Sequence, residues 1–484
     1  MQELEDLGSA YSLASWDEQT YCAERGREAR GHLLATLATV RHERIVDDAY
    51  GEVLDELASD GDGLTSEQRA MVRVAKRARD RDVKVPKDLV RALAEQRSRA
   101  SRAWLAARPA NDFASFAPEL AKLVRLKVEE ADALAFDHRY DALLDDFEPG
   151  MTVARLDPIL DGLRDELVPF VRRVLDAPSP DRGFLDGPYD QAGQLELMQR
   201  ILAAVGFDFA AGRQDLSAHP FCGGPSRRDV RLTTRVYDSL EPGSLFSSLH
   251  EMGHGLYEQG LAGFERTAIG HAPSLGLHES QSRFWENVVG RSQAFWQHFL
   301  PVAQDVFPGE LGGVSVDRFV RAVNRVARSA IRVDADEVTY NLHILLRYEL
   351  EKELVEERLA VADLPGAWRE RMQSYLGYTP RDDAEGVLQD IHWADGLFGY
   401  FPTYTLGNLY AAAITERMRG DLDLDAHVGR GEFGPVLRWL RERIHGQGFV
   451  RPAEDLMVEV TGKPLGHAPF MRYLEAKYGE LYDL

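Results

Sequence analysis

The 484-residue chain is predicted to be mainly α-helical, forming one large domain with a small β-strand region. Apolar residues recur every three to four positions along most of the sequence, which is the period of an amphipathic helix. Gly, Pro, Asp and Ser cluster at 59–64 and 178–192, where we expect loops. No internal repeat, low-complexity stretch or obvious linker divides the chain, so we expect a single domain covering 1–484.

The first predicted helix covers 31–45 and places Leu33, Leu37 and Val40 on one side. The same pattern predicts further helices, at 67–81, 86–107, 116–140, 152–176 and 191–205. The alternation within 228–238 instead predicts a strand, and the Gly- and Pro-rich stretch 217–227 before it predicts a loop. A helix should follow the strand, beginning after Pro242-Gly243 and ending at Gly260.

The composition excludes several classes of function. The formal net charge of −22 argues against a nucleic-acid partner and against binding to an anionic membrane. Two cysteines, Cys22 and Cys222, cannot form a disulfide framework in a chain of this size, which fits a reducing compartment. The acidic N-terminus lacks the apolar segment of a secretory signal, and no run of about 18 apolar residues predicts a membrane helix. We therefore expect a cytoplasmic protein.

His250-Glu251-Met252-Gly253-His254 is the most informative stretch of the sequence. In a helix this H-E-x-x-H spacing places two imidazoles on one face, one turn apart, where both can bind the same zinc ion. The Glu between them is placed to take a proton from a metal-activated water. An i, i+4 pair of His can also be ordinary helix packing, and the pattern alone does not separate the two interpretations.

A catalytic zinc site usually has a third protein ligand. Glu258 continues the His stripe, but it lies eight residues after His250, about 12 Å along the helix axis, which is too far for a shared ion. A carboxylate from a second helix is therefore needed. Glu279, at the start of an amphipathic stretch, is the best candidate, and Glu265 and Glu286 are weaker ones.

A competing metal interpretation comes from di-iron helical bundles, which carry two Glu-x-x-His motifs. Glu251 and His254 form one such half, and Glu442 and His445 form a second. The second half lies in an Arg-rich stretch that we expect to face solvent as a charged helix end. This interpretation also leaves His250 without a role, so we rank it below the zinc site.

Six ordered motifs make the chain similar to the carboxypeptidase Taq family of zinc metallocarboxypeptidases. Besides H-E-x-x-H, they resemble that family's HPF, DxRxT, HES(Q/R), IRxxAD and GxxQDxHW motifs, at 219–221, 229–233, 278–281, 331–336 and 386–393. The similarity runs from Trp16 to the C-terminal PFMRYLEAKYGELY. Two departures, Cys22-Ala23 in place of Met-Pro and Cys222 after the HPF-like motif, touch no proposed ligand; an inert buried thiol is the expectation for Cys222.

The resemblance implies a helical fold with a deep substrate groove, in which 1–190 form one wall and 191–484 form the catalytic part. It also implies one zinc ion per chain, replaceable by cobalt, with Glu279 as the third ligand beside His250 and His254. The implied protein is a homodimer. The implied activity is removal of C-terminal residues from peptides with broad specificity, with Glu251 as the general base.

Further roles follow from this implied chemistry. An enzyme that acts at a free C-terminus must bind a carboxylate, for which a bidentate guanidinium is suited, and Arg332 in the IRxxAD-like motif is our candidate. His392 and Tyr400 are candidates for stabilising the oxyanion, with Tyr404 as an alternative. His219 is a candidate for contacting the substrate backbone. The polar residues that we expect to support the site from outside are Asp229, Arg231, Asp336 and Gln389.

Two other functions stay open from the sequence. One is an oligoendopeptidase or dipeptidyl-type zinc peptidase on a related helical scaffold, which would cleave peptides with a blocked C-terminus. The other is a non-catalytic helical binding protein with a decayed site. The joint presence of His250, Glu251, His254 and Glu279 argues against the second.

Overall fold

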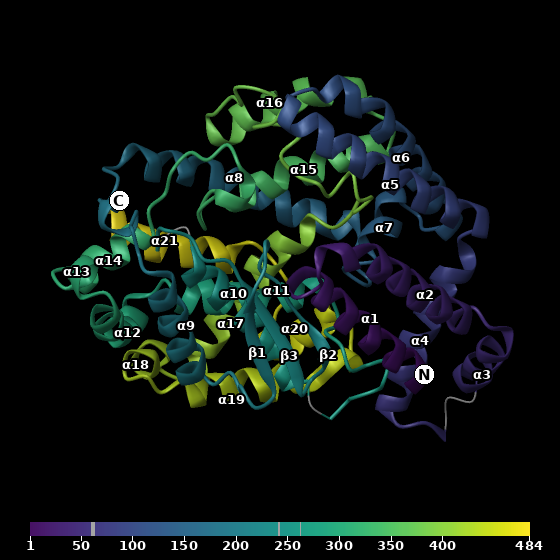
Figure 1. The fold of residues 1–484 in the computed structure, drawn as a ribbon, viewed down its shortest axis with the longest axis horizontal. Coiled ribbons are helices and arrows are strands. Elements are labelled where there is room, and N and C mark those ends of the chain that lie inside the picture. Colours follow the sequence, from purple (N-terminus) through teal and green to yellow (C-terminus); the bar gives the residue numbers. More distant parts are fainter. Residues whose placement is uncertain (60–62, 241–242, 262) are drawn as a thin grey trace. The chain divides into compact units, whose positions relative to one another are not determined.

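The structure is a computed structural model that describes residues 1–59, 63–240, 243–261 and 263–484 (Figure 1). Helices make up most of it, and a small three-stranded sheet accompanies them, so the predicted mainly helical class is confirmed. None of the described helices is both long enough and apolar enough to cross a membrane. The contacts group the chain into two compact units, each assembled from three separate segments.

The first unit contains Met1–Asp82, Pro180–Val323 and Tyr410–Pro464. Its elements are α1 (Gln2–Thr20), η1 (Glu24–Gly26), α2 (Arg27–Ile45), α3 (Asp48–Ser59), α4 (Ser66–Lys84, whose last two residues belong to the second unit), η3 (Gly183–Leu185), α9 (Gln191–Val205), β1 (Gly212–Leu216), β2 (Cys222–Ser226), β3 (Asp229–Thr234), α10 (Ser244–Gly260), α11 (Leu275–Arg283), η4 (Phe284–Val289), α12 (Gln293–Val306), α13 (Pro308–Leu311), α14 (Val316–Val323), α18 (Leu424–Gly429), α19 (Phe433–Arg443), η7 (His445–Val450) and α20 (Ala453–Thr461).

The second unit contains Val83–Ser179, Asn324–Leu409 and Leu465–Leu484. Its elements are α5 (Lys87–Ala110), α6 (Phe113–Leu134), α7 (Arg139–Leu144), α8 (Val153–Asp176), η5 (Arg332–Asp334), α15 (Tyr340–Val355), η6 (Val361–Asp363), α16 (Leu364–Leu376), the first part of α17 (Pro402–Asp421) and α21 (Ala468–Tyr482). The prediction of a groove with 1–190 as one wall and 191–484 as the catalytic part stays a prediction.

The helices predicted from periodicity form, with shifted ends in some cases. The segment predicted at 116–140 is an exception, because α6 ends at Leu134 and α7 begins at Arg139. Ala135 closes α6 with a φ of 58°, a left-handed cap that periodicity does not reveal. Of the loop predicted at 59–64, residues 60–62 lie outside the described part of the chain.

The sheet has the order β1-β3-β2, with β1 parallel and β2 antiparallel to β3. The predicted strand at 228–238 is confirmed as the shorter β3, but the predicted loop at 217–227 is wrong where β2 forms. Gly223 and Gly224 give β2 no alternating pattern, and pairing with β3 supplies the hydrogen bonds that make it a strand. β1 was not predicted either.

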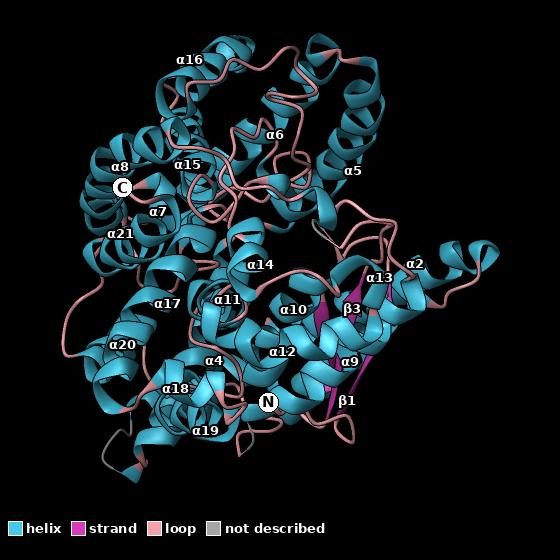
Figure 2. Ribbon diagram, turned by 90° about the vertical axis from the view of Figure 1, so that its left-hand side faces the viewer, coloured by secondary structure: helices cyan, strands magenta, loops and turns pink. Residues whose placement is uncertain are grey.

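The sheet supports α10, the helix that carries His250 and His254. The hydroxyl of Ser248 donates to Thr234 Oγ1 on β3, and Gln214 on β1 donates to the same serine at 2.9 Å. Figure 2 shows α10 beside the strands, which are coloured magenta. The strands therefore contact the polar side of α10, and this packing positions the helix that carries both His side chains.

Candidate metal centre and a second polar cluster

The predicted helix around H-E-x-x-H is confirmed as α10, which ends at Gly260. Gly253, inside the motif, lies against the backbone of α11, where an added Cβ would come within 2.5 Å of the carbonyl oxygen of Gln281. Only glycine allows the two helices to approach this closely. The residue between the two His therefore brings α11, and with it Glu279, to the His side chains.

Glu279 lies on α11, whose N-terminus is capped by the side chain of Ser274. Its Oε2 atom lies 3.2 Å from His254 Nε2 and 3.5 Å from His250 Nε2. One atom from each of the three residues lies within 4.8 Å of the other two. Two imidazole nitrogens and one carboxylate oxygen around a common point are the donors of a catalytic zinc site, so these residues fit a divalent metal ion.

The remaining carboxylate contacts fix Glu279 in place. Arg283 Nε donates to Oε1 at 2.7 Å, and the hydroxyl of Ser282 donates to Oε2 at 2.9 Å. Burial disfavours the carboxylate, but Arg283 and His250 outweigh burial and hold the pKa of Glu279 well below its usual range. The third donor is therefore an anion already oriented toward both imidazoles.

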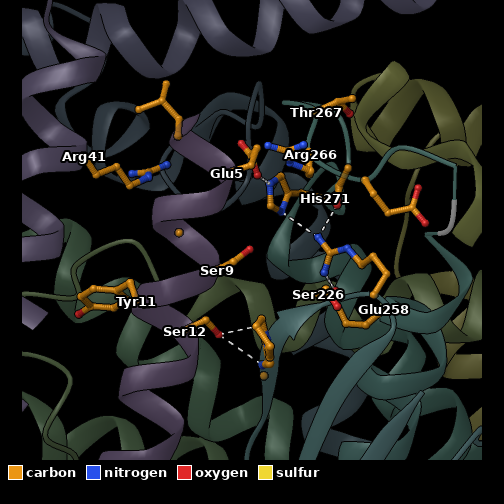
Figure 3. Close-up of a pocket in the computed structure, with 18 of the residues that line it drawn as sticks. Glu5, Ser9, Tyr11, Ser12, Arg41, Ser226, Glu258, Arg266, Thr267 and His271 are labelled. Carbon is orange, nitrogen blue, oxygen red and sulfur yellow. Dashed lines mark hydrogen bonds and ion pairs between the residues drawn. The ribbon is translucent and has the colours of Figure 1, made fainter. Parts of the chain in front are cut away.

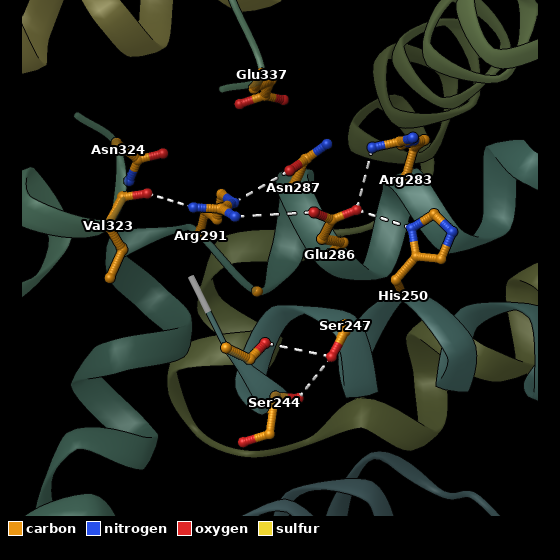
Figure 4. Close-up of polar contacts among 12 residues, drawn as sticks. Ser244, Ser247, His250, Arg283, Glu286, Asn287, Arg291, Val323, Asn324 and Glu337 are labelled. Carbon is orange, nitrogen blue, oxygen red and sulfur yellow. Dashed lines mark hydrogen bonds and ion pairs between the residues drawn. The ribbon is translucent and has the colours of Figure 1, made fainter. Parts of the chain in front are cut away.

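Glu286 orients His250 from outside the donor set (Figure 4). It lies on η4, a short π-helix that continues α11, and its Oε2 atom accepts from His250 Nδ1 at 2.9 Å. Arg283 and Arg291 lie 3.3 and 3.8 Å from the same carboxylate. A hydrogen bond from Nδ1 to a carboxylate leaves Nε2 as the metal-facing nitrogen. Glu286, predicted as a weaker ligand candidate, thus contacts His250, one of the three residues that could hold a metal ion.

The two imidazoles titrate differently without a metal. Burial lowers the pKa of His254 to about 3, helped by His278 nearby. Burial also acts against the charged form of His250, but Glu279 and Glu286 outweigh it and raise the pKa of His250 to about 9. At neutral pH the metal-free site therefore holds a proton on His250 that a metal ion would displace.

Glu251 is buried on α10 beside the three donor residues. Burial raises its pKa to about 7, while His250 acts in the opposite direction. A carboxyl group with a pKa near neutrality is suited to take up and release a proton during a reaction. The positive charge of a metal ion would favour the ionised carboxylate, the form that accepts a proton.

Four predicted substrate and catalytic residues, Arg332, His392, Tyr400 and Tyr404, belong to the second unit. Arg332 is only 6 % exposed, and its Nε and Nη2 atoms donate to Asp390 Oδ1 at 3.0 and 2.9 Å. Its Nη1 atom donates to Tyr340 at 2.9 Å. Three of its five N–H groups are engaged in these bonds.

A second guanidinium shares the same carboxylate. Arg347 is fully buried on α15 and donates from Nε to Asp390 Oδ2 at 2.7 Å. Gln389 accepts from Arg347 and from the backbone N–H of Arg332, and it donates to the carbonyl of Ala330. Two buried cations around a single aspartate leave the cluster electropositive, an environment that favours an additional anion.

His392 lies beside this cluster among aromatic rings. Its Nε2 atom is 3.4 Å from the hydroxyl of Tyr404, and its ring centroid is 5.5 Å from that of Tyr400. Burial lowers the pKa of His392 to about 4, so the ring is neutral at pH 7. A neutral imidazole and two phenols are groups that can donate hydrogen bonds without carrying a charge.

The remaining predicted residues are His219, Asp229, Arg231 and Asp336. His219 is exposed in the turn between β1 and β2, where its carbonyl accepts from Ser217. Asp229 pairs with Arg231 at 2.8 Å, and that guanidinium lies over the ring of Trp16. Asp336 accepts from the backbone of Ala327, Val338 and Thr339. These contacts give Asp229, Arg231 and Asp336 structural partners.

The expectation that the Glu442-x-x-His445 stretch faces solvent is wrong for His445, which is fully buried. Its Nε2 atom lies 2.9 Å from Gln281 Oε1, and its ring packs against Tyr257. His445 is the first residue of η7, beyond the charged end of α19, so the Arg-rich sequence before it gave no sign of burial. It does not belong to the group of described residues that can hold a metal ion.

His278 contacts a candidate metal donor, and the sequence did not single it out for a role. It precedes Glu279 in the HES-like motif, and its Nδ1 atom lies 2.5 Å from His254 Nδ1. Its Nε2 atom lies 2.8 Å from Glu258, the residue excluded as a ligand. Its position one residue before the third donor was the available signal.

A helical scaffold that brings H-E-x-x-H against a glutamate on a second helix defines a metal-dependent hydrolase site. Comparison of the chain with known protein families agrees with this class. The family model described as carboxypeptidase Taq (M32) metallopeptidase matches residues 1–478. The chain therefore belongs to the carboxypeptidase Taq (M32) family, and the protein is a metallocarboxypeptidase.

Relatives match along essentially the whole chain. It is 44% identical to thermostable carboxypeptidase 1 of Thermus thermophilus, covering 98% of this chain and 96% of the relative. It is 37% identical to carboxypeptidase 1 of Bacillus subtilis, covering 100% and 97%. The crystal structure of the M32 carboxypeptidase from Deinococcus radiodurans superposes with a TM-score of 0.97 at 40% identity, covering 100% and 98%.

Proposed function

We propose that this metallocarboxypeptidase uses one zinc ion on His250, His254 and Glu279 to remove C-terminal residues from peptides with broad specificity. The observation that carries the proposal is the convergence of both Nε2 atoms on Glu279 Oε2, at 3.2 and 3.5 Å. Cobalt should be able to replace zinc, because both ions accept imidazole and carboxylate donors. A zinc ion held by three protein donors would have a position open to water or substrate.

When bound, the ion would polarise the scissile carbonyl and lower the pKa of a water molecule toward neutrality. Glu251 takes the proton of the attacking water on its carboxylate. The same carboxyl then delivers that proton to the leaving amine, because burial keeps its pKa near the working range. Glu286 and His278 hold the two imidazoles so that their Nε2 atoms stay directed at the ion.

Arg332 would bind the free C-terminal carboxylate of the substrate. Two of its N–H groups are not used by Asp390 or Tyr340 among the described residues, so they can donate to an incoming anion. The neighbouring Arg347 pairs with the same carboxylate, so among the described ion pairs the two guanidiniums share the single negative charge of Asp390. His392, Tyr400 and Tyr404 would donate hydrogen bonds to substrate oxygens, including the developing oxyanion.

Some predictions stay open. His219 stays a prediction for contact with the substrate backbone, and the homodimer and the cytoplasmic location stay predictions as well. The endopeptidase or dipeptidyl alternative is distinguished from the proposal by whether a blocked C-terminus prevents cleavage. No observation favours the di-iron alternative, which metal analysis would detect as iron in place of zinc.

Glu251→Gln tests the proton transfer. The amide has nearly the same shape as the carboxyl but cannot accept the proton, so kcat should fall by about 100-fold or more. Bound zinc, measured by elemental analysis, should stay near one ion per chain, because Glu251 is not a donor. Retention of full activity with full zinc content would exclude Glu251 as the base.

Arg332→Ala tests the carboxylate contact. Loss of a charge-assisted hydrogen bond should lower kcat/KM for peptides with a free C-terminus by roughly 10- to 100-fold. The same peptides with an amidated C-terminus, which are poor substrates from the start, should lose little further. An equal loss for both peptide series would contradict the contact. Circular dichroism of the variant checks that removing this buried side chain leaves the helices intact.

A further inference from the structure

A continuous line of polar side chains runs from His254 to the N-terminal helix α1. His254 Nδ1 is 2.5 Å from His278 Nδ1, and His278 Nε2 is 2.8 Å from Glu258 Oε1. The other oxygen of Glu258 pairs with Arg227. Arg227 also contacts His271 Nδ1 at 3.1 Å, and His271 Nε2 lies 2.9 Å from Glu5 Oε2.

The outer half of this line lies in a cavity of about 670 Å³ within the first unit (Figure 3). Glu5 comes from α1, Glu258 from the last turn of α10, and Arg227 and His271 from loops. Figure 3 labels Glu5, His271 and Glu258 in this cavity; Glu5 pairs with His271, and Arg227 contacts both His271 and Glu258. Arg227 also donates to the carbonyl of Gly270, so its position is fixed by several partners.

The hydrogen bonds along the line have only one consistent set of donors. His254 must leave Nε2 free for the ion, so Nδ1 carries its proton and donates to His278. His278 therefore accepts on Nδ1 and donates from Nε2, and Glu258 is the carboxylate that receives this bond. Arg227 holds Glu258 in place as an anion. Glu258 thus fixes the tautomer of His278, and His278 fixes the tautomer of His254.

The two metal-binding His are thus supported differently. His250 donates directly to the carboxylate of Glu286, whereas His254 reaches the carboxylate of Glu258 only through the neutral ring of His278. Glu258 lies one turn after His254 on the same face of α10. It is too far from His250 to bind the same ion, but the ring of His278 connects its carboxylate to His254.

We propose that Glu258, held by Arg227, is a positioning residue for the metal centre that fixes His278 and, through it, the metal-facing tautomer of His254. The proposal concerns zinc affinity and rests on the proposed ligand set. The proposal does not depend on any step of the catalysed reaction. Removing the charge of Glu258 should weaken zinc binding by roughly 10-fold, the lower end of the range for groups that support metal ligands.

Glu258→Gln is the direct test, with the zinc dissociation constant of the protein measured by chelator competition. Glu265→Gln is the matched control, because Glu265 lines the same cavity but pairs with Arg228 and stands outside the line. The expected result is a loss of roughly 10-fold for Glu258→Gln and a change under about twofold for the control. Equal dissociation constants for the two variants would overturn the proposal.

A double-mutant cycle tests whether Glu258 acts through His278. In a His278→Phe background, adding Glu258→Gln should change zinc affinity by less than about twofold, because the intermediate ring is already absent. Additive losses would overturn the proposal. The visible absorption of the cobalt-loaded protein gives a second measurement, since altered orientation of His254 should shift its bands in Glu258→Gln and leave them unchanged in Glu265→Gln.

Arg227→Lys provides a second variant should Glu258→Gln fail to fold. Lysine keeps the positive charge but lacks the fork that reaches Glu258, Gly270 and His271 together, so zinc affinity should fall by a few fold. An unchanged dissociation constant would overturn the proposal. Failure of the ligand set itself would be distinguishable, because elemental analysis would then find no stoichiometric zinc in the unmodified protein.

Discussion

Glu351 gives the second unit a stability that depends on pH. Its carboxyl group is fully buried on α15 and accepts hydrogen bonds from Tyr140 at 2.8 Å, Trp393 at 2.8 Å and the backbone of Gly399 at 3.1 Å. Burial raises the pKa of Glu351 to about 7 from 4.5, although these hydrogen bonds act in the opposite direction. The side chain thus connects α15 to the segment that carries His392 and Tyr400.

The sign of the effect follows from the raised pKa. The folded protein holds the proton of Glu351 more tightly than the unfolded chain, so the stabilisation is complete below pH 4.5 and is lost as the pH rises through 7. The full difference corresponds to about 3 kcal/mol, of which about 2 kcal/mol is lost between pH 5.5 and 7.5. Glu351→Gln cannot ionise and should lack this part of the pH dependence.

Urea unfolding of the metal-free protein and of Glu351→Gln at pH 5.5, 6.5, 7.5 and 8.5 measures the difference. The variant should start less stable at pH 5.5, because an amide cannot accept from all three donors. Between pH 5.5 and 7.5, its free energy of unfolding should then fall by about 2 kcal/mol less than that of the unmodified protein. Parallel curves for the two proteins would show that Glu351 does not cause this pH dependence.

Three further predictions concern the metal centre. Gly253→Ala should separate α10 from α11 by forcing its Cβ against Gln281, lowering both the melting temperature and the zinc affinity; an unchanged zinc dissociation constant would count against the close approach. Glu286→Gln should weaken zinc binding by about 10- to 100-fold, more than Glu258→Gln, because Glu286 contacts His250 directly whereas Glu258 reaches His254 only through His278. A larger loss of zinc affinity in Glu258→Gln than in Glu286→Gln would contradict this difference. Zinc binding at pH 7 should release about one proton from His250 and a further fraction of a proton from Glu251, but none from His254, as calorimetry in buffers of different ionisation enthalpy measures; no release would be inconsistent with the raised pKa of His250.

Local patterns predicted the helices and the metal-bearing motif. His250 and His254 are related by a single turn of one helix, so their common face follows from helix geometry. The rejection of Glu258 as a ligand used the same geometry, and in the structure Glu258 contacts His278. Helix geometry required an acid on another helix, for which Glu279 was the best candidate ahead of Glu265 and Glu286, and the family resemblance implied the same residue as the third ligand.

The parts that escaped prediction depend on contacts between distant segments. β1 and β2 are five-residue strands with glycine and polar residues, and they exist because β3 pairs with both. His445 is buried because it meets Gln281, which is 164 positions earlier in the sequence. The π-helix that directs Glu286 at His250 has no signature in hydrophobic periodicity. In each case the deciding interaction lies outside any local window of sequence.

Removal of single residues from a free C-terminus can be observed by mass spectrometry of a short peptide incubated with the zinc-loaded protein. We expect a ladder of products that lose residues one at a time from the C-terminus, and no ladder from the same peptide with an amidated C-terminus. Internal fragments, or equal cleavage of the amidated peptide, would contradict it.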